Sequence, residues 1–201
     1  MIAIIDYDAG NMKSVVKACY HLGQEITVTR DEAVLENADK IILPGVGAFG
    51  DAMKRLSGYG LVPVIRRVIK ENKPFLGICL GLQLLYGESE EAPGIQGIGA
   101  LDGIIRKIPK GEYKKIPHMG WNSLEFPNRG RLFDGIPENS YVYFVHSYYL
   151  EAKDRETVVA TCDYNTMIDA SVESGNLFAC QFHPEKSGSV GLKILENFIR
   201  L

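Results

Sequence analysis

The sequence predicts an α/β fold with a mostly parallel central sheet, helices on both faces of that sheet and a mixed β extension. In the first half, short apolar runs alternate with segments of helical periodicity, which is typical of βαβ units and a parallel sheet. From about Gly99 to Phe182 the chain is richer in β-branched and aromatic residues between Pro and Gly turns, which indicates further strands. Residues 187–201 have the spacing of a terminal amphipathic helix.

The expected elements of the first half follow one another in order. "MIAIID" is an apolar strand ending at a Gly-Asn turn, and residues 11–22 follow with helical spacing. "EITVTR" alternates like a strand, and "DEAVLENA" predicts a short helix with Asp31 as its N-cap. The next segments are a strand, a glycine-rich turn and a helix in "KIILPGVGAFGDAMKRL", a helix in "LVPVIRRVIKENK", a buried strand in "PFLGIC" and the start of a helix in "LGLQLLYG".

The second half supplies the β extension, in "SYVYFVHSYYLEA", "ETVVATCDY" and "LFACQFH". We see no linker, repeat or low-complexity tract in the sequence. We therefore expect one domain over residues 1–201.

Composition and charge exclude several classes of function. Of the 201 residues, 46% are apolar and 23% are charged, which is ordinary for a soluble globular protein. A net charge of -3 gives no general attraction to nucleic acid or to an anionic membrane. The first apolar run meets Asp6 after five residues, too early for a signal peptide or a membrane span, so we expect a cytoplasmic protein.

The four cysteines, Cys19, Cys79, Cys162 and Cys180, include no CxxC pair and no His partner at zinc-ligand spacing. A disulfide scaffold is not expected in a protein of this size and composition. Cys19 lies on an expected amphipathic helix and Cys162 on an expected strand, so we interpret both as small buried hydrophobes.

Cys79 lies between Gly77 and Gly81, where a strand should end and a helix should begin. Ligands bind at the carboxyl ends of parallel strands, and a sharp turn of small residues there exposes its central side chain, as in a nucleophile elbow. The helix dipole would lower the pKa of the thiol, and the backbone amide of Leu80 could stabilise an oxyanion. A lone GxCxG also fits a buried strand cysteine, so the interpretation needs a base.

A base is available in "CQFHPEKS", where His183 follows an apolar strand and Glu185 comes two residues later. Residues i and i+2 of an extended segment point the same way, so Glu185 can fix the tautomer of His183. An isolated HPE could also be a surface turn. Together with an exposed cysteine at a strand end, it favours a nucleophile, a base and an orienting carboxylate.

The glycine-rich stretch "LPGVGAFGDAM" could be a plain strand–helix connection. Its glycine content favours a second role, in which the amides of Val46 and Gly47 supply another oxyanion donor. Because glycine-flanked peptides flip with little steric penalty, we also expect the Gly45–Val46 peptide to present either its carbonyl or its amide to this site.

Together, "GICLGLQLL", "LPGVGAFG" and "CQFHPEKS" resemble the triad (class I) glutamine amidotransferases in order and separation. "KIPHMGWNSL", "YFVHSYY" and "DYDAGNMKSV" are similar to stretches of the glutaminase subunits of imidazole glycerol phosphate synthases, from histidine biosynthesis. The resemblance runs from Asp6 to the terminal helix and implies a flavodoxin-like class I glutamine amidotransferase fold. The family often has glycine where this sequence has Asp8.

The resemblance implies that Cys79 attacks the side-chain amide of glutamine and that His183, oriented by Glu185, transfers the protons. A γ-glutamyl thioester forms and is then hydrolysed. Gln83 matches a family position that helps to hold glutamine; from spacing alone it could be a solvated helix residue. No cofactor and no metal are implied.

The resemblance also implies a partner, a (β/α)8 cyclase subunit that receives the ammonia through an internal tunnel and with which the chain forms a heterodimer. The cyclase makes imidazole glycerol phosphate and an aminoimidazole carboxamide ribonucleotide. The residues expected at the contact are Asn11, His118, Met119, Trp121, Asn122, Tyr143 and Lys186. Trp121 could instead be a core aromatic, and His146 is interpreted as a core or supporting residue.

Three other functions fit parts of the sequence. A triad glutaminase of another synthase would share the cysteine and histidine motifs but not "PHMGWN" with "YFVHSYY". A stand-alone cysteine hydrolase would need a wide cleft and no partner. A non-catalytic flavodoxin-like binding module would have no reason to combine Cys79, His183 and Glu185.

Overall fold

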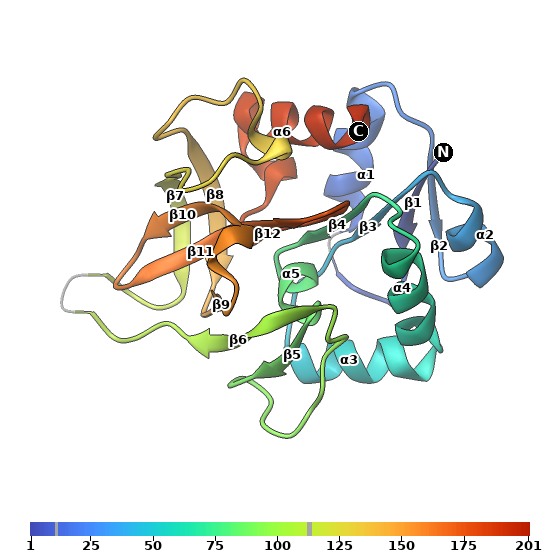
Figure 1. Cartoon of the computed structure of the whole chain (residues 1–201), viewed down its shortest axis with the longest axis horizontal. Coiled ribbons are helices and arrows are strands. Elements are labelled where there is room, and N and C mark those ends of the chain that lie inside the picture. The colour runs from blue at the N-terminus through green and yellow to red at the C-terminus, as the bar shows by residue number, and fades with distance from the viewer. Residues whose placement is uncertain (11, 112–113) are drawn as a thin grey trace.

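In the part of the chain that the structure describes, ten strands form a mixed sheet at the centre of the molecule (Figure 1). The computed structural model describes residues 1–10, 12–111 and 114–201. The strands are β1 (Ile2–Ile5), β2 (Ile26–Thr29), β3 (Lys40–Leu43), β4 (Phe75–Ile78), β5 (Tyr86–Ser89), β6 (Leu101–Lys107), β7 (His118–Ser123), β8 (Tyr141–His146), β9 (Tyr148–Ala152), β10 (Val158–Asp163), β11 (Met167–Ser174) and β12 (Leu177–Cys180). The helices are α1 (Met12–His21), α2 (Glu32–Asn37), α3 (Phe49–Gly58), α4 (Leu61–Lys70), α5 (Leu80–Leu84) and α6 (Gly188–Arg200), with short 3-10 helices η1 (Arg131–Phe133), η2 (Arg155–Thr157) and η3 (Pro184–Lys186).

The parallel part of the sheet has the strand order β2-β1-β3-β4-β12. All four neighbouring pairs in it are parallel. The register places Leu43 beside Gly77 and Ile78 beside Cys180. The carboxyl ends of β3, β4 and β12 therefore meet at one edge, the position at which sheets of this kind bind ligands.

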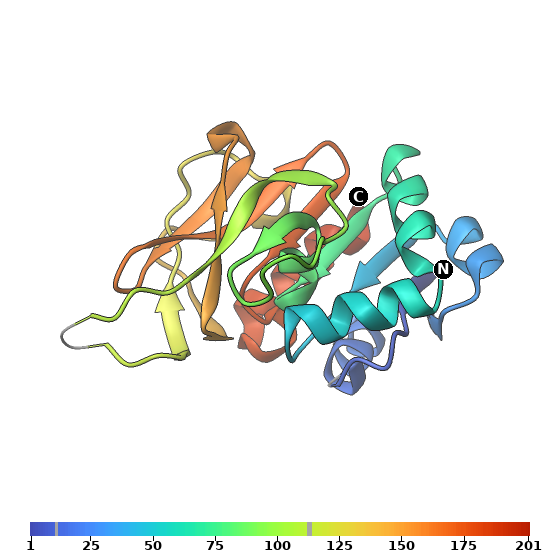
Figure 2. The ribbon, with the colours of Figure 1, turned by 90° about the horizontal axis from the view of Figure 1, so that it is seen from below.

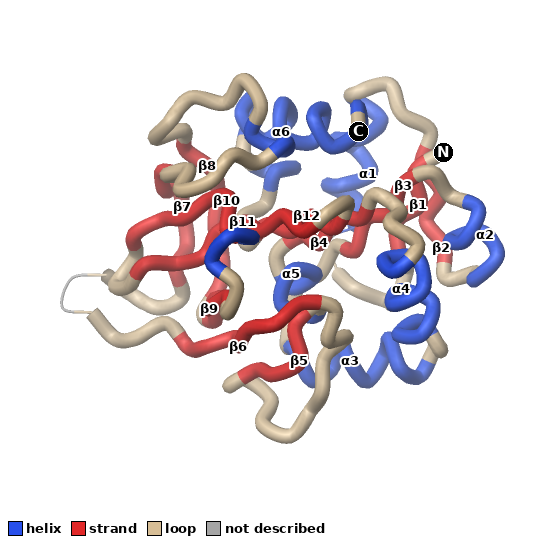
Figure 3. The backbone as a smooth tube through the Cα atoms, viewed as in Figure 1, coloured by secondary structure: helices blue, strands red, loops and turns tan. Residues whose placement is uncertain are grey.

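Helices cover both faces of the parallel part. α1 and α6 lie on one face, and α3, α4 and α5 lie on the other (Figure 3). Strand side chains alternate between the two layers: Ile2 and Ile4 pack into the apolar cluster under α1 and α6, and Ala3 and Ile5 into the cluster under α3 and α4. Strands buried on both faces explain the nearly continuous apolar runs of the first half.

The β extension lies at the end of the molecule opposite α2 and β2 (Figure 2). There β11 pairs antiparallel with β12, β9 and β10, while β6 pairs with β9 and β5. β7 and β8 form a separate two-stranded antiparallel sheet.

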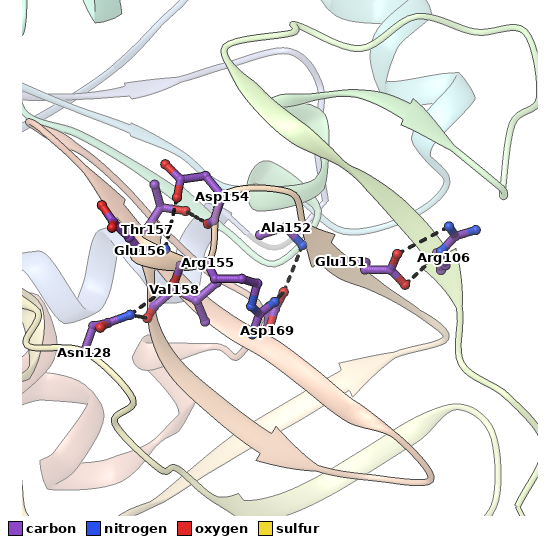
Figure 4. A network of polar contacts seen from close by, with 10 residues as sticks. All are labelled: Arg106, Asn128, Glu151, Ala152, Asp154, Arg155, Glu156, Thr157, Val158 and Asp169. Atoms are coloured by element: carbon purple, nitrogen blue, oxygen red, sulfur yellow. Dashed lines mark hydrogen bonds and ion pairs between the residues drawn. The ribbon is translucent and has the colours of Figure 1, made fainter.

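A polar network holds the connection between β9 and β10 (Figure 4). Asp169 of β11 is 2% exposed, accepts a hydrogen bond from the amide of Ala152 at 2.9 Å and forms an ion pair with Arg155. Asn128 donates to the carbonyl oxygens of Arg155 and Val158. The buried carboxylate thus has both a charged and a backbone partner, as burial of a charge requires.

The structure confirms the predicted α/β class and the order of elements in the first half. The side chain of Asp31 accepts from the amide of Val34 and caps α2, as predicted. The helix predicted in "LGLQLLYG" is shorter than expected, because α5 ends at Leu84 and Tyr86 starts a strand that pairs with Leu101. In the described part of the chain, no helix has the length and apolarity needed to cross a membrane.

Candidate active site

Three predicted segments meet where the carboxyl ends of β3, β4 and β12 lie side by side. The loop at residues 44–48 follows β3, Cys79 follows β4, and the segment 181–183 follows β12. The amide of Cys79 donates to the carbonyl of Cys180 at 2.8 Å, which joins two of these segments directly. Residues more than a hundred positions apart in the sequence thus form one site.

Cys79 occupies a strained turn between β4 and α5, with φ 55° and ψ -107°. The two glycines around it are required by space: a Cβ on Gly77 would lie 2.8 Å from the carbonyl oxygen of Gly81, and one on Gly81 would lie 1.9 Å from that of Leu43. A positive φ at a non-glycine residue of this kind is characteristic of functional sites. The structure confirms the predicted sharp turn between strand and helix, but the prediction that it exposes the thiol is wrong, because Cys79 is buried and only 6% exposed.

His183 and Glu185 form a buried pair. Nδ1 of His183 lies 2.8 Å from Oε1 of Glu185, and the two side chains are 2% and 1% exposed. Nε2 of His183 has no hydrogen-bond partner among the described residues, so it can exchange a proton with Cys79 or with a ligand. Burial lowers the pKa of His183, but interactions with Cys79 and with Glu185 outweigh it and raise the pKa to about 9.

The other three cysteines are unreactive by comparison. Burial raises the pKa of Cys19 to about 11 and that of Cys162 to about 12, and it raises the pKa of Cys180 well above the ordinary value. All three are at most 1% exposed. A thiol that cannot ionise near neutral pH is a poor nucleophile.

The glycine-rich loop covers the first amide of α5. The amide of Leu80 donates to the carbonyl of Gly45 at 3.3 Å, so this predicted oxyanion donor is engaged within the protein. Beneath the loop, the hydroxyl of Tyr7 donates to the carbonyl of Pro44 at 2.9 Å, and a Cβ on Gly45 would lie 2.3 Å from that hydroxyl. Gly47 has φ 106°, which favours glycine. The structure therefore shows the carbonyl-inward orientation of the two that the sequence predicts.

A pocket of about 350 Å³ opens onto Cys79. Its lining consists of Val46, Gly47, Cys79, Leu80, Gln83, Glu91, Pro117, Val145, His146, Ser147 and Tyr148. A larger hollow of about 800 Å³ lies between residues 126–138 and the end of α6, and it contains none of the three predicted catalytic residues. The smaller pocket is the one in which chemistry at the thiol can take place.

Gln83 is oriented by two acceptors, a half-buried carbonyl and a buried side-chain oxygen. Its Nε2 donates to the carbonyl of Tyr148 and to Oε1 of Gln181, both at 3.0 Å. Both amide hydrogens are therefore used, and Gln83 also belongs to the lining of the pocket. Gln83 is 5% exposed, which excludes the alternative of a solvated helix residue.

Sequence reasoning missed three residues of the site: Tyr7, Glu91 and Gln181. Glu91 lines the pocket, and its Oε2 accepts from the amide of Phe49, the first residue of α3. Gln181 stands two residues before His183, a spacing that places both side chains on the same side of an extended segment. That spacing was a usable signal, whereas Tyr7 and Glu91 come from distant segments.

Comparisons with known proteins agree with this geometry. A family model described as "Glutamine amidotransferase class-I" matches residues 3–201. The chain belongs to the class-I glutamine amidotransferase family. The solved structure of a glutamine amidotransferase superposes with a TM-score of 0.78 at 19% identity and covers 100% of this chain and 98% of its own. A glutamine amidotransferase from Thermotoga maritima superposes with a TM-score of 0.66 at 19% identity and covers 99% of this chain and 82% of its own.

Sequence relatives are more specific. The chain is 50% identical over 197 residues to the "Imidazole glycerol phosphate synthase subunit HisH" of Moorella thermoacetica, covering 98% of this chain and 93% of the relative. It is 49% identical to the subunit of the same name from Methanothermobacter thermautotrophicus over 201 residues, covering 100% of this chain and 98% of the relative. The subunit of Aquifex aeolicus is 50% identical over 198 residues, with 98% and 95% covered.

The family resemblance also predicted a partner surface, and most of its residues lie on one face of the β7–β8 sheet or beside it. Met119 and Trp121 are 62% and 55% exposed, Lys186 is exposed, and Tyr143 is half-buried and meets Trp121 edge-on at a ring distance of 6.1 Å. The alternative of a core Trp121 is therefore excluded. Asn11 lies outside the described residues.

His118 does not lie on that surface. It is 2% exposed and stacks between Phe144 and Tyr164, at ring distances of 4.6 and 3.8 Å. The prediction of direct partner contact is corrected, because His118 and Met119 point to opposite faces of β7. Asn122 lies on the same face of β7 as His118, with its Nδ2 3.4 Å from Nε2 of His118, so its predicted place on the partner surface is corrected for the same reason.

His118 and His146 form a second buried pair. Nδ1 of His118 lies 2.9 Å from Nε2 of His146, and Nδ1 of His146 lies 2.8 Å from the carbonyl of Tyr148. Burial lowers the pKa of His118 to about 3 and that of His146 to about 4. His146 is thus a neutral supporting residue at the pocket, in agreement with the sequence interpretation.

Proposed function

We propose that this chain is the glutaminase subunit of an imidazole glycerol phosphate synthase, in which it hydrolyses L-glutamine to glutamate and ammonia for a (β/α)8 cyclase subunit. The observation that carries the proposal is the meeting of Cys79, His183 and Glu185 at adjacent strand ends beside a pocket. Relatives that are half identical over the whole chain are named as subunits of that synthase.

The pocket supports binding of glutamine with its side-chain amide toward Cys79. Glu91 is the acidic side chain of the lining, so it is the expected partner of the α-ammonium group. The free oxygen of Gln83 accepts from an N–H of the substrate. Ser147 and Tyr148 also line the pocket. A pocket of this size suits an amino acid better than an extended peptide, which argues against a stand-alone peptidase.

Cys79 attacks the amide carbon of glutamine as a thiolate, with the proton held by His183. The tetrahedral intermediate collapses, the C–N bond breaks, and His183 gives its proton to the departing nitrogen, which leaves as ammonia. His183 then takes a proton from water as the water attacks the thioester. The second intermediate releases glutamate and returns the thiolate and the imidazolium. Glu185 holds Nδ1 and keeps Nε2 directed at these transfers.

The negative oxygen of both intermediates needs donors. The amide of Leu80 is one, once it is released from the carbonyl of Gly45, and the amides of Val46 and Gly47 supply the other. The structure holds the Gly45–Val46 peptide with its carbonyl inward, so we propose a resting state with low activity. Rotation of this one peptide would free one donor and add another.

We propose that the cyclase binds on the face formed by Met119, Trp121, Tyr143 and Lys186, whereas Asn122 points to the opposite face of β7 with His118. Close docking would deliver ammonia before water protonates it, and the cyclase would form imidazole glycerol phosphate and an aminoimidazole carboxamide ribonucleotide. The four cysteines are all free and buried, which supports a reducing, cytoplasmic setting. The two apolar clusters share one central sheet, which supports a single domain over residues 1–201.

Cys79→Ala tests the proposal. In a complex with the cyclase, this variant should lose glutamine-dependent formation of imidazole glycerol phosphate but keep the reaction with added ammonium salt, because only the thiol is removed. Cys162→Ala is the matched control, since that buried thiol lies on β10, and it should keep both reactions. Loss of the ammonium-dependent reaction by Cys79→Ala would contradict a role confined to glutamine hydrolysis.

A further inference from the structure

Gln181 is a fully buried polar residue to which the mechanism above gives no role. It follows the last residue of β12, and its backbone amide donates to the carbonyl of Ala170 at 2.8 Å. Its side chain reaches the reacting atom: Nε2 lies 3.7 Å from Sγ of Cys79. Burial of an amide is costly unless its groups are hydrogen-bonded, so this placement has a reason beyond packing.

The orientation of the Gln181 amide follows from its neighbours. The carbonyl of Tyr148 can only accept, so the atom of Gln83 that contacts it at 3.0 Å is the nitrogen. That nitrogen also contacts the Gln181 side chain at 3.0 Å, and the atom it meets there must be the acceptor oxygen. The remaining atom of the Gln181 amide, the one that faces Cys79, is therefore the NH2 group.

The same carbonyl fixes the rest of the chain of hydrogen bonds. Nδ1 of His146 donates to Tyr148, which leaves Nε2 of His146 to accept from Nδ1 of His118. Nε2 of His118 then accepts from the amide of Asn122. All hydrogen bonds in this series therefore run in the same direction, from Asn122 toward the carbonyl of Tyr148. An alternative orientation of Gln181 would place its NH2 group against the donor nitrogen of Gln83, which leaves two donors facing each other.

The sulfur of Cys79 has contacts of two kinds. Besides His183, the carbonyl of Val145 lies 3.9 Å away, and this acceptor favours the protonated thiol. The NH2 group of Gln181 is a donor and favours the thiolate. Because the elbow leaves Cys79 only 6% exposed, little water is available to solvate the negative sulfur. A permanent neutral donor is needed there, since His183 must give its proton away in each cycle.

We propose that Gln181 is a further catalytic residue, whose side-chain amide donates a hydrogen bond to the Cys79 thiolate and stabilises it before attack and after release of glutamate. This inference rests on the proposed function for its role in turnover, but the thiolate contact itself does not depend on the substrate. Gln83 then has two tasks, since it lines the glutamine pocket and holds Gln181 with its nitrogen.

The test is the pH dependence of alkylation of Cys79 by iodoacetamide without glutamine, followed by mass spectrometry of the Cys79 peptide. Gln181→Glu keeps the shape and the acceptor for Gln83 but places an oxygen opposite the sulfur. Gln181→Met keeps the volume and removes the donor. In both variants the alkylation midpoint should rise by about one pH unit, and the rate at pH 7 should fall about tenfold, which corresponds to about 1.4 kcal/mol.

Ser171→Ala is the matched control, because Ser171 is equally buried on the neighbouring strand and its hydroxyl donates to the carbonyl of Ala179. Its alkylation profile should match that of the unchanged protein. In turnover, Gln181→Met should lower kcat for glutamine more than it raises KM. Alkylation profiles of both Gln181 variants that coincide with the unchanged protein would overturn the inference. A shifted profile in a chain that does not hydrolyse glutamine would instead leave the inference standing and count against the proposed function.

Discussion

The acid–base behaviour of the site is set at His183, where opposing effects act on one ring. Burial alone would keep the ring neutral, yet Cys79 and Glu185 raise its pKa to about 9. The protonated imidazole is then the main form at neutral pH, and it can supply the proton that the departing nitrogen requires. The buried carboxylate of Glu185 is thus useful for its charge as well as for the direction it gives to Nδ1.

We expect kcat for glutamine to fall as the pH rises through about 9, because His183 then loses its proton. Glu185→Gln removes a charge that raises this pKa, so its alkaline limb should move to lower pH, and its kcat should fall roughly 100- to 10,000-fold. The measurement is the pH profile of kcat. The control is Glu196→Gln. This variant removes an acidic residue of α6 that pairs with Lys193 and Arg200 at the surface. Alkaline limbs at the same pH in both variants would show that Glu185 does not set the pKa of His183.

At the scale of elements, the glycine-rich loop is held by the segment that follows β1. Tyr7 is 1% exposed and bonds the carbonyl of Pro44, directly before the peptide that covers Leu80. A Cβ on Gly10 would lie 3.2 Å from Val46, so the same segment also touches the far side of the loop. Movement of the Gly45–Val46 peptide is therefore linked to the position of residues 7–10.

Tyr7→Phe removes the hydroxyl that anchors the loop with its carbonyl inward. We expect kcat of the isolated chain for glutamine to rise about two- to tenfold, as the loss of one neutral hydrogen bond permits. Tyr86→Phe is the control, because Tyr86 is equally buried but lies on β5. The measurement is kcat for glutamine in a steady-state glutaminase assay. An unchanged or lower kcat in Tyr7→Phe would show that the hydroxyl does not stabilise the resting loop.

Some of this structure could be predicted from local sequence and some could not. Apolar spacing predicted the strands and helices of the parallel half, and the meeting of Cys79 and His183 follows because parallel strands end at one edge. The early end of α5 depends on pairing of Tyr86 with Leu101, which no local pattern reveals. The burial of His118 could have been predicted from the sequence, because the side chains of a strand alternate between its two faces. Tyr7 and Glu91 could not, because only the tertiary fold brings them to the site.

Asp8 links the residue and element scales. Its φ of 59° is a conformation that glycine adopts freely and that other residues rarely adopt. Here the side chain of Asp8 pairs with Arg30 and accepts a hydrogen bond from Tyr59. These contacts, to the loop before α2 and to the end of α3, offset the strain of the left-handed backbone.

For the whole molecule, the neutral pair His118 and His146 makes stability depend on pH. In the unfolded chain both would bind protons near pH 6.5, but in the fold their pKa values are about 3 and about 4. Between these limits the unfolded chain binds more protons, so the free energy of unfolding falls as the pH is lowered from 6.5 toward 4.

His118→Phe should reduce this acid sensitivity while keeping a ring between Phe144 and Tyr164. The measurement is the urea midpoint at pH 7 and at pH 5 for both proteins. We expect the variant to start from a lower midpoint, because His146 loses a hydrogen bond, and to lose less on acidification. His21→Phe is the control, since that residue ends α1 at the surface. An equal loss in His118→Phe and in the unchanged protein would show that His118 is not the group responsible.

The backbone of Tyr143 joins the proposed partner face to the segment that carries His183. The carbonyl of Tyr143 accepts from the amide of His183 at 2.9 Å, and the amide of Tyr143 donates to the hydroxyl of Ser187 at 3.0 Å. That hydroxyl donates in turn to the carbonyl of His183. A protein that docks against Trp121 and Tyr143 would therefore also act on the segment that carries His183. A second connection runs through the segment before residue 11, because Gly10 lies next to Val46.

This connection predicts that glutamine hydrolysis depends on the state of the whole complex. We expect kcat for glutamine to be low in the isolated chain and in the empty complex, and roughly 100- to 1,000-fold higher when the cyclase holds its nucleotide substrate, because release of the Leu80 amide restores an oxyanion donor. Val46→Pro deletes the amide that rotation would bring inward, so all three values should stay low, whereas Val46→Ala keeps that amide and should respond like the unchanged protein. Equal kcat values in the three states of the unchanged protein would remove the case for a switch at Gly45–Val46. A full response in Val46→Pro would place the switch at another peptide.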